Sequence, residues 1–179
     1  DTAAEDAAFV VYTSGTAATP KGVVHAHRSA WGRRPILTGW LGLGPDDVLL
    51  HAGALSWTYT LGVGLVDPWA AGATAVVYAG ERPAGFNGSG AWWTLLAASR
   101  ASVFAAVPGV YRQMLHGVRP PGVHLSALRH GAVAGEALTP ALWHEWRDTT
   151  GLDLFEALGM SEISTFISSA PPGPGFAGV

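Results

Sequence analysis

The sequence predicts an α/β fold in which a largely parallel sheet is flanked by helices. Short runs rich in β-branched and aromatic residues alternate along the chain with longer segments of helical spacing, which is typical of this class. Most of the short runs are apolar throughout rather than alternating, as expected for strands that are covered on both faces. With 179 residues, the chain is about one domain long.

The predicted elements follow one another in regular order. We expect strands at residues 8–12, 48–51, 74–78, 102–106, 128–133 and 152–157, and helices at residues 27–41, 60–71, 91–100, 109–116 and 140–150. The last helix is marked best, with Thr139 as its N-cap, Pro140 in its first turn and Gly151 as its C-terminal stop. Gly72 ends the second helix in the same way.

The composition excludes several classes of protein. Hydrophobic residues make up 49% of the chain and charged residues only 13%, so the chain buries much of itself or expects neighbouring protein. A net charge of −3 without blocks of like charge argues against nucleic-acid binding. The sequence shows no membrane span and no secretory signal, so we expect a soluble cytoplasmic protein. The absence of cysteine excludes disulfides and thiolate chemistry.

The two ends of the sequence look like cuts in a longer protein. The chain starts at Asp1 without a methionine and stops at Val179, directly after a stretch rich in glycine and proline. We therefore expect residues 1–179 to be one piece of a larger polypeptide.

The loop Y-T-S-G-T-A-A-T-P-K-G-V, residues 12–23, is suited to binding phosphate groups. It directly follows a predicted strand and combines small residues, hydroxyl groups and the compact positive charge of Lys21. It is not an ordinary P-loop, because Pro20 precedes the lysine and Gly22 follows it where a hydroxyl would bind magnesium. The alternative is a polar surface loop with a solvated lysine.

Two further loops follow predicted strands at the edge where parallel sheets bind ligands. In L-G-M-S-E, residues 158–162, Glu162 could hold a hard cation and Ser161 could donate to a phosphate oxygen, although such a pair also starts helices. In A-G-E-A-L, residues 134–138, Gly135 would let the backbone approach a flat ring. The alternative for this second loop is a plain strand-to-helix connection.

A fourth segment, S-W-T-Y-T-L-G-V-G at residues 56–64, places two aromatic side chains two positions apart. If the segment is extended, Trp57 and Tyr59 lie on one side of it and could wall an apolar cavity. The alternative is that both rings pack in the core.

The order S-G-x-x-x-x-P-K-G in the first loop resembles the signature of the adenylate-forming superfamily, with Ala17 and Ala18 as departures from it. The L-G-M-S-E loop is similar to that family's [YF]-G-x-T-E motif, and G-E-A-L to its G-E-[AP]-L turn. The segments at residues 57–74 and 102–115 are similar to those of benzoate-type CoA ligases. All of them occur in the order found in the family.

This resemblance implies a role for each matching residue. Lys21 and Glu162 would carry the catalysis, the latter as the ligand of Mg²⁺. The remaining contacts would be Thr13, Ser14, Gly15, Thr16 and Lys21 with the β- and γ-phosphates of ATP, Ser161 with the α-phosphate, Gly135, Glu136 and Ala137 with adenine, and Trp57, Tyr59, Leu158 and Gly159 with the acid substrate. Glu156 falls near the adenine amine in the same comparison.

The function implied is that of an acid–thiol ligase. An aryl or other apolar carboxylate would be activated by ATP to an acyl adenylate and then transferred to coenzyme A. Residues 1–179 would be part of the N-terminal domain, and we expect them to be inactive without the C-terminal domain of the same polypeptide. Two alternatives stay open: a non-catalytic or degenerate nucleotide-binding or protein-interaction module, and an adenylation domain that loads a carrier protein.

Overall fold

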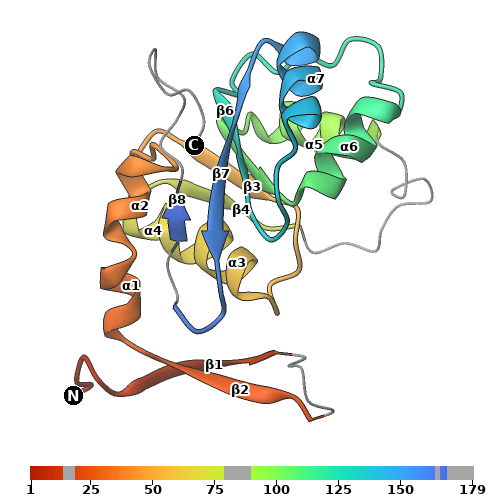
Figure 1. Ribbon diagram of the computed structural model, residues 1–179. Helices are drawn as coiled ribbons and strands as arrows, with labels where there is room; N and C mark the ends of the chain where they lie inside the picture. The colour runs from red at the N-terminus through yellow and green to blue at the C-terminus, as the bar shows by residue number, and fades with distance from the viewer. Residues whose placement is uncertain (14–18, 79–89, 164–165, 169–179) are drawn as a thin grey trace.

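The predicted α/β fold is confirmed by the computed structural model, which describes residues 1–13, 19–78, 90–163 and 166–168 (Figure 1). Its main sheet has the strand order β4-β3-β5-β6-β7-β8, in which the first five strands are parallel and β8 is antiparallel to β7. These strands are β3 (Val48–His51), β4 (Thr74–Val76), β5 (Val103–Ala106), β6 (His130–Val133), β7 (Asp153–Gly159) and β8 (Phe166–Ser168).

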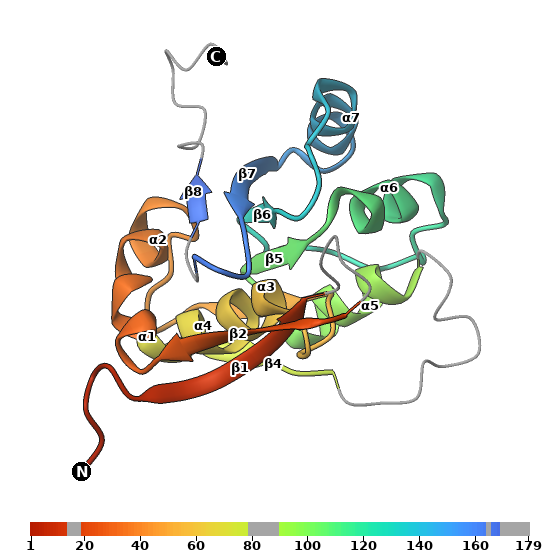
Figure 2. The same ribbon diagram turned by 60° about the horizontal axis from the view of Figure 1, so that its bottom comes forward.

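Helices cover both faces of this sheet (Figures 1 and 2). One face carries α1 (Arg28–Gly32), α2 (Arg34–Gly39), α3 (Thr58–Leu61), the π-helical turn η1 (Gly62–Val66) and α4 (Asp67–Ala70), and the other carries α5 (Gly90–Ser99), α6 (Pro108–His116) and α7 (Pro140–Thr150). Adjacent strand residues point to opposite faces, so Leu49 packs in the first layer and Leu50 in the second. The strands are therefore apolar throughout, as the sequence predicted.

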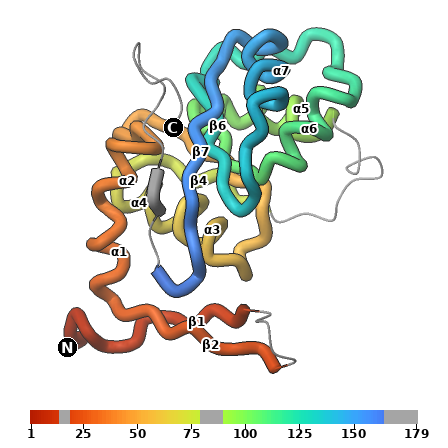
Figure 3. Tube along the Cα trace, viewed as in Figure 1, coloured from red at the N-terminus to blue at the C-terminus, as the bar shows by residue number. Residues whose placement is uncertain are grey.

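The predicted strand at residues 8–12 is real, but it does not join the parallel sheet. It forms β1 (Ala7–Thr13), which pairs with β2 (Lys21–Ala26) in a separate antiparallel hairpin. Side chains of β1 alternate between buried Val11 and exposed Val10 and Tyr12, because only one face of the hairpin is covered. Strands β2 and β8 were not predicted. Figure 3 shows the chain leaving the hairpin and running along one side of the sheet.

The last predicted helix agrees with the structure at both ends. Thr139 accepts a hydrogen bond from the amide of Leu142 at 3.3 Å, and Gly151 adopts a left-handed conformation at φ 74° that ends α7. Gly72 ends α4 with the same φ of 74°. The capping rules identified these ends because capping depends on local backbone groups alone.

The predicted helix at residues 27–41 is broken into α1 and α2, and the predicted helix at 60–71 contains the wider η1 turn. Arg33 lies at the break, and its side chain reaches the neighbouring helix α4 in the same layer. There it donates to both carboxylate oxygens of Asp67, at 2.7 and 2.5 Å, with both side chains almost fully buried. The guanidinium also lies against Gly62, where a Cβ atom would come within 2.6 Å of it. This ion pair joins α1 and α2 to the helical segment that follows β3.

Among the described residues, no helix combines the length and the apolar character that a membrane span requires.

Replacing Arg33 by methionine should strongly destabilise the fold. The variant leaves the carboxylate of Asp67 buried without its partner, and such losses cost about 3–5 kcal/mol. Urea denaturation followed by circular dichroism measures the change. The matched control is Arg28→Met, which removes the exposed pair with Glu5 and should cost less than about 1 kcal/mol. Equal effects of the two substitutions would contradict the structural role of the buried pair.

Stability should also fall as the pH is lowered from about 6.5 towards 4. Burial lowers the pKa of His51 to about 3 and that of His130 to about 4, so each side chain binds a proton more readily in the unfolded chain. A lowered folded-state pKa gives stability that is complete above the unfolded pKa of 6.5 and is lost as the pH falls towards the folded value. We expect about 1.4 kcal/mol per pH unit for each histidine. Urea denaturation at several pH values should show a flatter profile for the His51→Gln/His130→Gln variant, and an unchanged slope would refute this assignment.

Candidate functional site

The loops that follow the parallel strands meet at one edge of the sheet. Each of β3, β5, β6 and β7 ends there, and the hairpin lies beyond this edge (Figure 1). Segments 52–57, 134–139 and 160–163 therefore come together although they are far apart in the sequence. Each of them overlaps a segment that the sequence singled out, at residues 56–64, 134–138 and 158–162 respectively.

A cavity of about 420 Å³ lies between the loop after β6 and the end of β7. Its lining consists of Gly135, Glu136, Ala137, Glu156, Ala157, Leu158 and Gly159. Leu158 is 64% exposed, so the cavity is open to solvent. The structure thus brings the residues expected to contact adenine together with two residues expected to contact the acid.

Glu156 holds this cavity in shape. Its Oε1 accepts a hydrogen bond from the backbone amide of Leu138 at 2.7 Å, which fastens the loop after β6 to the neighbouring strand. The residue was expected beside a ligand, and it lines the cavity while its carboxylate anchors the loop.

Gly135 allows an aromatic ring to lie against the same loop. Its φ of +89° is a conformation that side chains rarely adopt, and a Cβ atom there would lie 2.6 Å from the indole of Trp57. Trp57 is partly exposed, so one part of its ring covers the glycine and another part faces solvent. The loops after β3 and β6 are in direct contact through this pair.

Tyr59 differs from its expected position. Trp57 directly precedes α3 whereas Tyr59 lies inside it, so the two rings do not share one side of an extended strand; they meet edge to face at 5.3 Å. Tyr59 is only 3% exposed, and its hydroxyl donates to the carbonyl of Ala132 at 3.1 Å. Burial raises the pKa of this phenol. Tyr59 is therefore a core residue that packs against the Trp57 ring, and it does not line the cavity beside Gly135.

Ser161 and Glu162 lie in the turn after β7. The hydroxyl of Ser161 is hydrogen-bonded to that of Thr58 at 3.1 Å, which links the turn to the first residue of α3. The Glu162 side chain is exposed beside it. The sequence did not single out Thr58, because a threonine between two aromatic residues carries no signal of its own.

The hairpin carries the predicted phosphate loop. Thr13 and Lys21 are paired across β1 and β2 and so flank this loop, and Lys21 is exposed. Ser14, Gly15 and Thr16 lie outside the described residues. The described part of the chain contains no cluster of three or more histidine, aspartate or glutamate side chains arranged for a metal.

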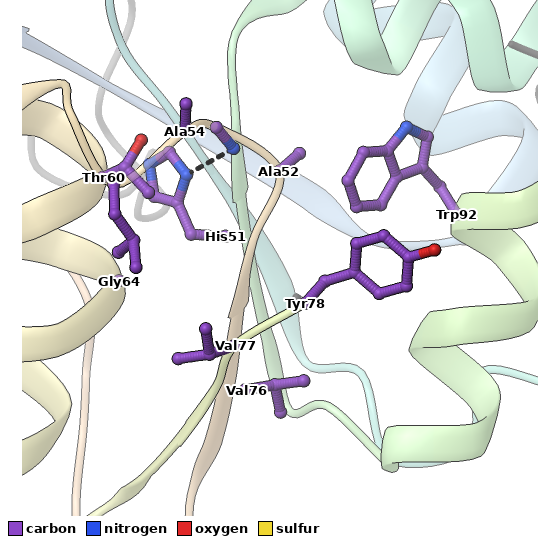
Figure 4. A pocket seen from close by; sticks show the side chains of 11 residues that line it. His51, Ala52, Ala54, Thr60, Gly64, Val76, Val77, Tyr78 and Trp92 are labelled. Atoms are coloured by element: carbon purple, nitrogen blue, oxygen red, sulfur yellow. Dashed lines mark hydrogen bonds between the residues drawn. The ribbon is translucent and has the colours of Figure 1, made fainter. Parts of the chain in front are cut away.

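A second cavity, of about 310 Å³, lies at the same edge beside the ends of β3 and β4 (Figure 4). His51 and Thr60 lie on one side of it, and Tyr78 and Trp92 on the other. The Nδ1 atom of His51 accepts the amide of Gly53 at 2.9 Å, and the lowered pKa of the imidazole keeps the ring neutral. The described lining has no charged side chain, so the cavity suits an uncharged group. Thr60 and Gly64 of this lining belong to the segment at residues 56–64 that the sequence singled out.

The chain is similar to known proteins in sequence and in fold. The chain is 35% identical over 164 residues to benzoate–CoA ligase of Thauera aromatica, a match that covers 89% of this chain and 29% of the relative. Among solved structures, the anthranilate CoA ligase AuaEII in complex with anthranoyl-AMP superposes with a TM-score of 0.83 at 29% identity, covering 94% of this chain and 32% of that one. A benzoate CoA ligase from Burkholderia xenovorans LB400 gives a TM-score of 0.80 at 31% identity, covering 95% and 33%.

The chain thus spans about a third of the length of these relatives. The resemblance to benzoate-type ligases noted from the motifs is confirmed by all three proteins. The family described as AMP-binding enzyme matches residues 1–177, which is nearly the whole chain. The chain therefore belongs to the AMP-binding family of adenylate-forming enzymes.

Proposed function

We propose that this chain forms the nucleotide- and acid-binding part of a ligase that activates an aryl or other apolar carboxylate with ATP and passes it to coenzyme A. One observation carries the proposal: the indole of Trp57 lies against Gly135, beside the cavity lined by Ala137 and Leu158. An aromatic wall for the acid thus adjoins an open hollow for the adenine ring. Residues 1–179 would belong to the N-terminal domain, and a C-terminal domain would complete the enzyme.

The relatives support this assignment. The ligase of Thauera aromatica is named for benzoate and coenzyme A, and the AuaEII structure contains anthranoyl-AMP, which is an aryl adenylate. Both names describe aromatic acids, which agrees with the partly exposed indole ring of Trp57 at this edge of the sheet. We favour coenzyme A over a carrier protein as the acceptor, because these two relatives and the Burkholderia xenovorans enzyme are all named as CoA ligases.

The adenine ring would occupy the 420 Å³ cavity against the backbone of Gly135, Glu136 and Ala137. Leu158 and Gly159 would contact the ligand from the opposite side, where β7 ends. Gly135 has no side chain, so a flat ring can approach the backbone of its loop closely. The acid would lie beside Trp57, with Tyr59 supporting the indole from the core.

The phosphates would extend towards the hairpin. Thr13, Ser14, Gly15, Thr16 and Lys21 would hold the β- and γ-phosphates, and Ser161 would donate to an α-phosphate oxygen. Lys21 supplies a compact positive charge, and its exposed position leaves its ammonium group accessible to a ligand.

In the first step, a carboxylate oxygen of the acid would form a bond to the α-phosphorus while the bond to the pyrophosphate oxygen breaks. In the second, the thiol sulfur would bond to the acyl carbon while the bond to AMP breaks, and the thiol proton passes to solvent. Neither step needs a protein nucleophile. The side chains contribute by aligning the reactants and by compensating negative charge as it moves to the leaving group.

The residues present fit a magnesium ion. Mg²⁺ prefers oxygen ligands and is usually bound through one or two carboxylates together with substrate phosphates and water. The exposed carboxylate of Glu162, next to the proposed α-phosphate contact, would hold it. When bound, the ion would neutralise phosphate charge.

Replacing Glu162 by glutamine should lower acid-dependent ATP–pyrophosphate exchange by about 100-fold or more, because a neutral amide cannot hold the cation that offsets phosphate charge. The assay uses the complete polypeptide that contains this chain, with benzoate among the acids. Glu145→Gln, which removes a half-exposed carboxylate on α7, is the matched control and should retain native exchange. Native activity in the Glu162 variant would refute the metal assignment.

Replacing Gly135 by alanine should lower kcat/KM for the acid by about tenfold or more, because the new methyl group would displace the Trp57 ring. The matched control is Gly122→Ala. Gly122 has a similar φ of +76°, but a Cβ atom there meets nothing within 4 Å. The control therefore introduces backbone strain without a collision. If both variants lose activity equally, the contact between Gly135 and Trp57 does not shape the acid site.

A further inference from the structure

The proposed α-phosphate contact depends on a turn that has few connections to the rest of the fold. The turn at residues 160–163 follows β7 and is closed by a backbone hydrogen bond from Ile163 to Met160 at 3.3 Å. Met160 is 57% exposed and Ile163 37%, so neither side chain anchors the turn in the core. In the described part of the chain, the bond between Thr58 and Ser161 is the one side-chain hydrogen bond that ties this turn to another element.

Thr58 belongs to a helical segment that is fixed by a buried ion pair. It is the first residue of α3, which continues through η1 into α4, where Asp67 is locked to Arg33 in the buried ion pair. Thr58 lines a small space of about 20 Å³ together with Phe9 of the hairpin and Gly62 of η1. The threonine therefore sits where the hairpin, the helical layer and the turn after β7 meet.

The hydroxyl chemistry gives this bond a direction. A serine hydroxyl has one proton to donate and can accept two hydrogen bonds. If Ser161 donates its proton to a phosphate oxygen, it must accept the proton of Thr58. A donor that also accepts a hydrogen bond is polarised and becomes the stronger donor. The threonine would therefore both orient Ser161 and strengthen its contact with phosphate.

We propose that Thr58 is a positioning residue that holds Ser161, and with it the turn carrying Glu162, in place for the α-phosphate. This inference rests on the proposed function for the identity of the ligand. The hydrogen bond on which it stands is a feature of the fold and can be tested separately.

Four variants of the complete polypeptide test the proposal: Thr58→Val, which keeps the shape but removes the hydroxyl, Thr58→Ser, which keeps the hydroxyl, Ser161→Ala, and the double variant Thr58→Val/Ser161→Ala. In ATP–pyrophosphate exchange, Thr58→Val should lower kcat by about tenfold with less than about a twofold change in the KM for ATP, whereas Thr58→Ser should stay within about twofold of native. The double variant should match Ser161→Ala, because the threonine acts through the serine.

Hydrogen–deuterium exchange of the amides at residues 160–163 provides a readout that does not need activity. Exchange should become several-fold faster in Thr58→Val and stay native in Thr58→Ser. Unchanged exchange in Thr58→Val, or effects of the two single substitutions that multiply in the double variant, would overturn the proposal. The native protein could show no ATP–pyrophosphate exchange with any of the acids tested while Thr58→Val still speeds amide exchange in the turn. In that case the proposed function fails and the positioning role of Thr58 stands.

Discussion

The parallel pairing of β3, β5, β6 and β7 is the constraint on which the rest of this structure depends. Parallel strands all end at one edge, so every loop that follows a strand begins next to its neighbours. The pairing is stable because both faces are buried: Phe104 and Leu154 pack under one helical layer, and Val103 and Ala157 under the other. The candidate site is a direct consequence of this geometry.

Small residues and one buried ion pair turn that edge into a site with defined shape. Gly135 gives the Trp57 ring a place to lie, and Gly62 does the same for the guanidinium of Arg33. The Arg33–Asp67 pair fixes the helical segment after β3, and Glu156 fixes the loop after β6. Together these contacts restrain the helical segment after β3 and the loop after β6. A site that acts by aligning its reactants needs such rigid supports.

The hairpin stands apart from the sheet in both topology and burial. Among the described residues its two strands pair only with each other, and Val10, Tyr12 and Val24 remain exposed on one face. A two-stranded hairpin gains little stability by itself, so its covered face, with Val11 and His25, has to dock on the remaining fold. In the proposed function, this docking sets the distance between the phosphate loop and the turn that carries Ser161.

The sequence by itself determined the α/β class, the ends of α7 and the segments that form the site, because strand apolarity, capping and loop motifs are local properties. It assigned Gly135 and Leu158 to separate motifs, and they line one cavity because the loop after β6 lies next to the end of the adjacent parallel strand β7. Only the tertiary structure decided that Tyr59 is buried in the core, that β1 pairs outside the main sheet and that Thr58 meets Ser161. Those outcomes depend on contacts between residues far apart in the chain, such as the 103 positions that separate Thr58 from Ser161, and no local pattern records them.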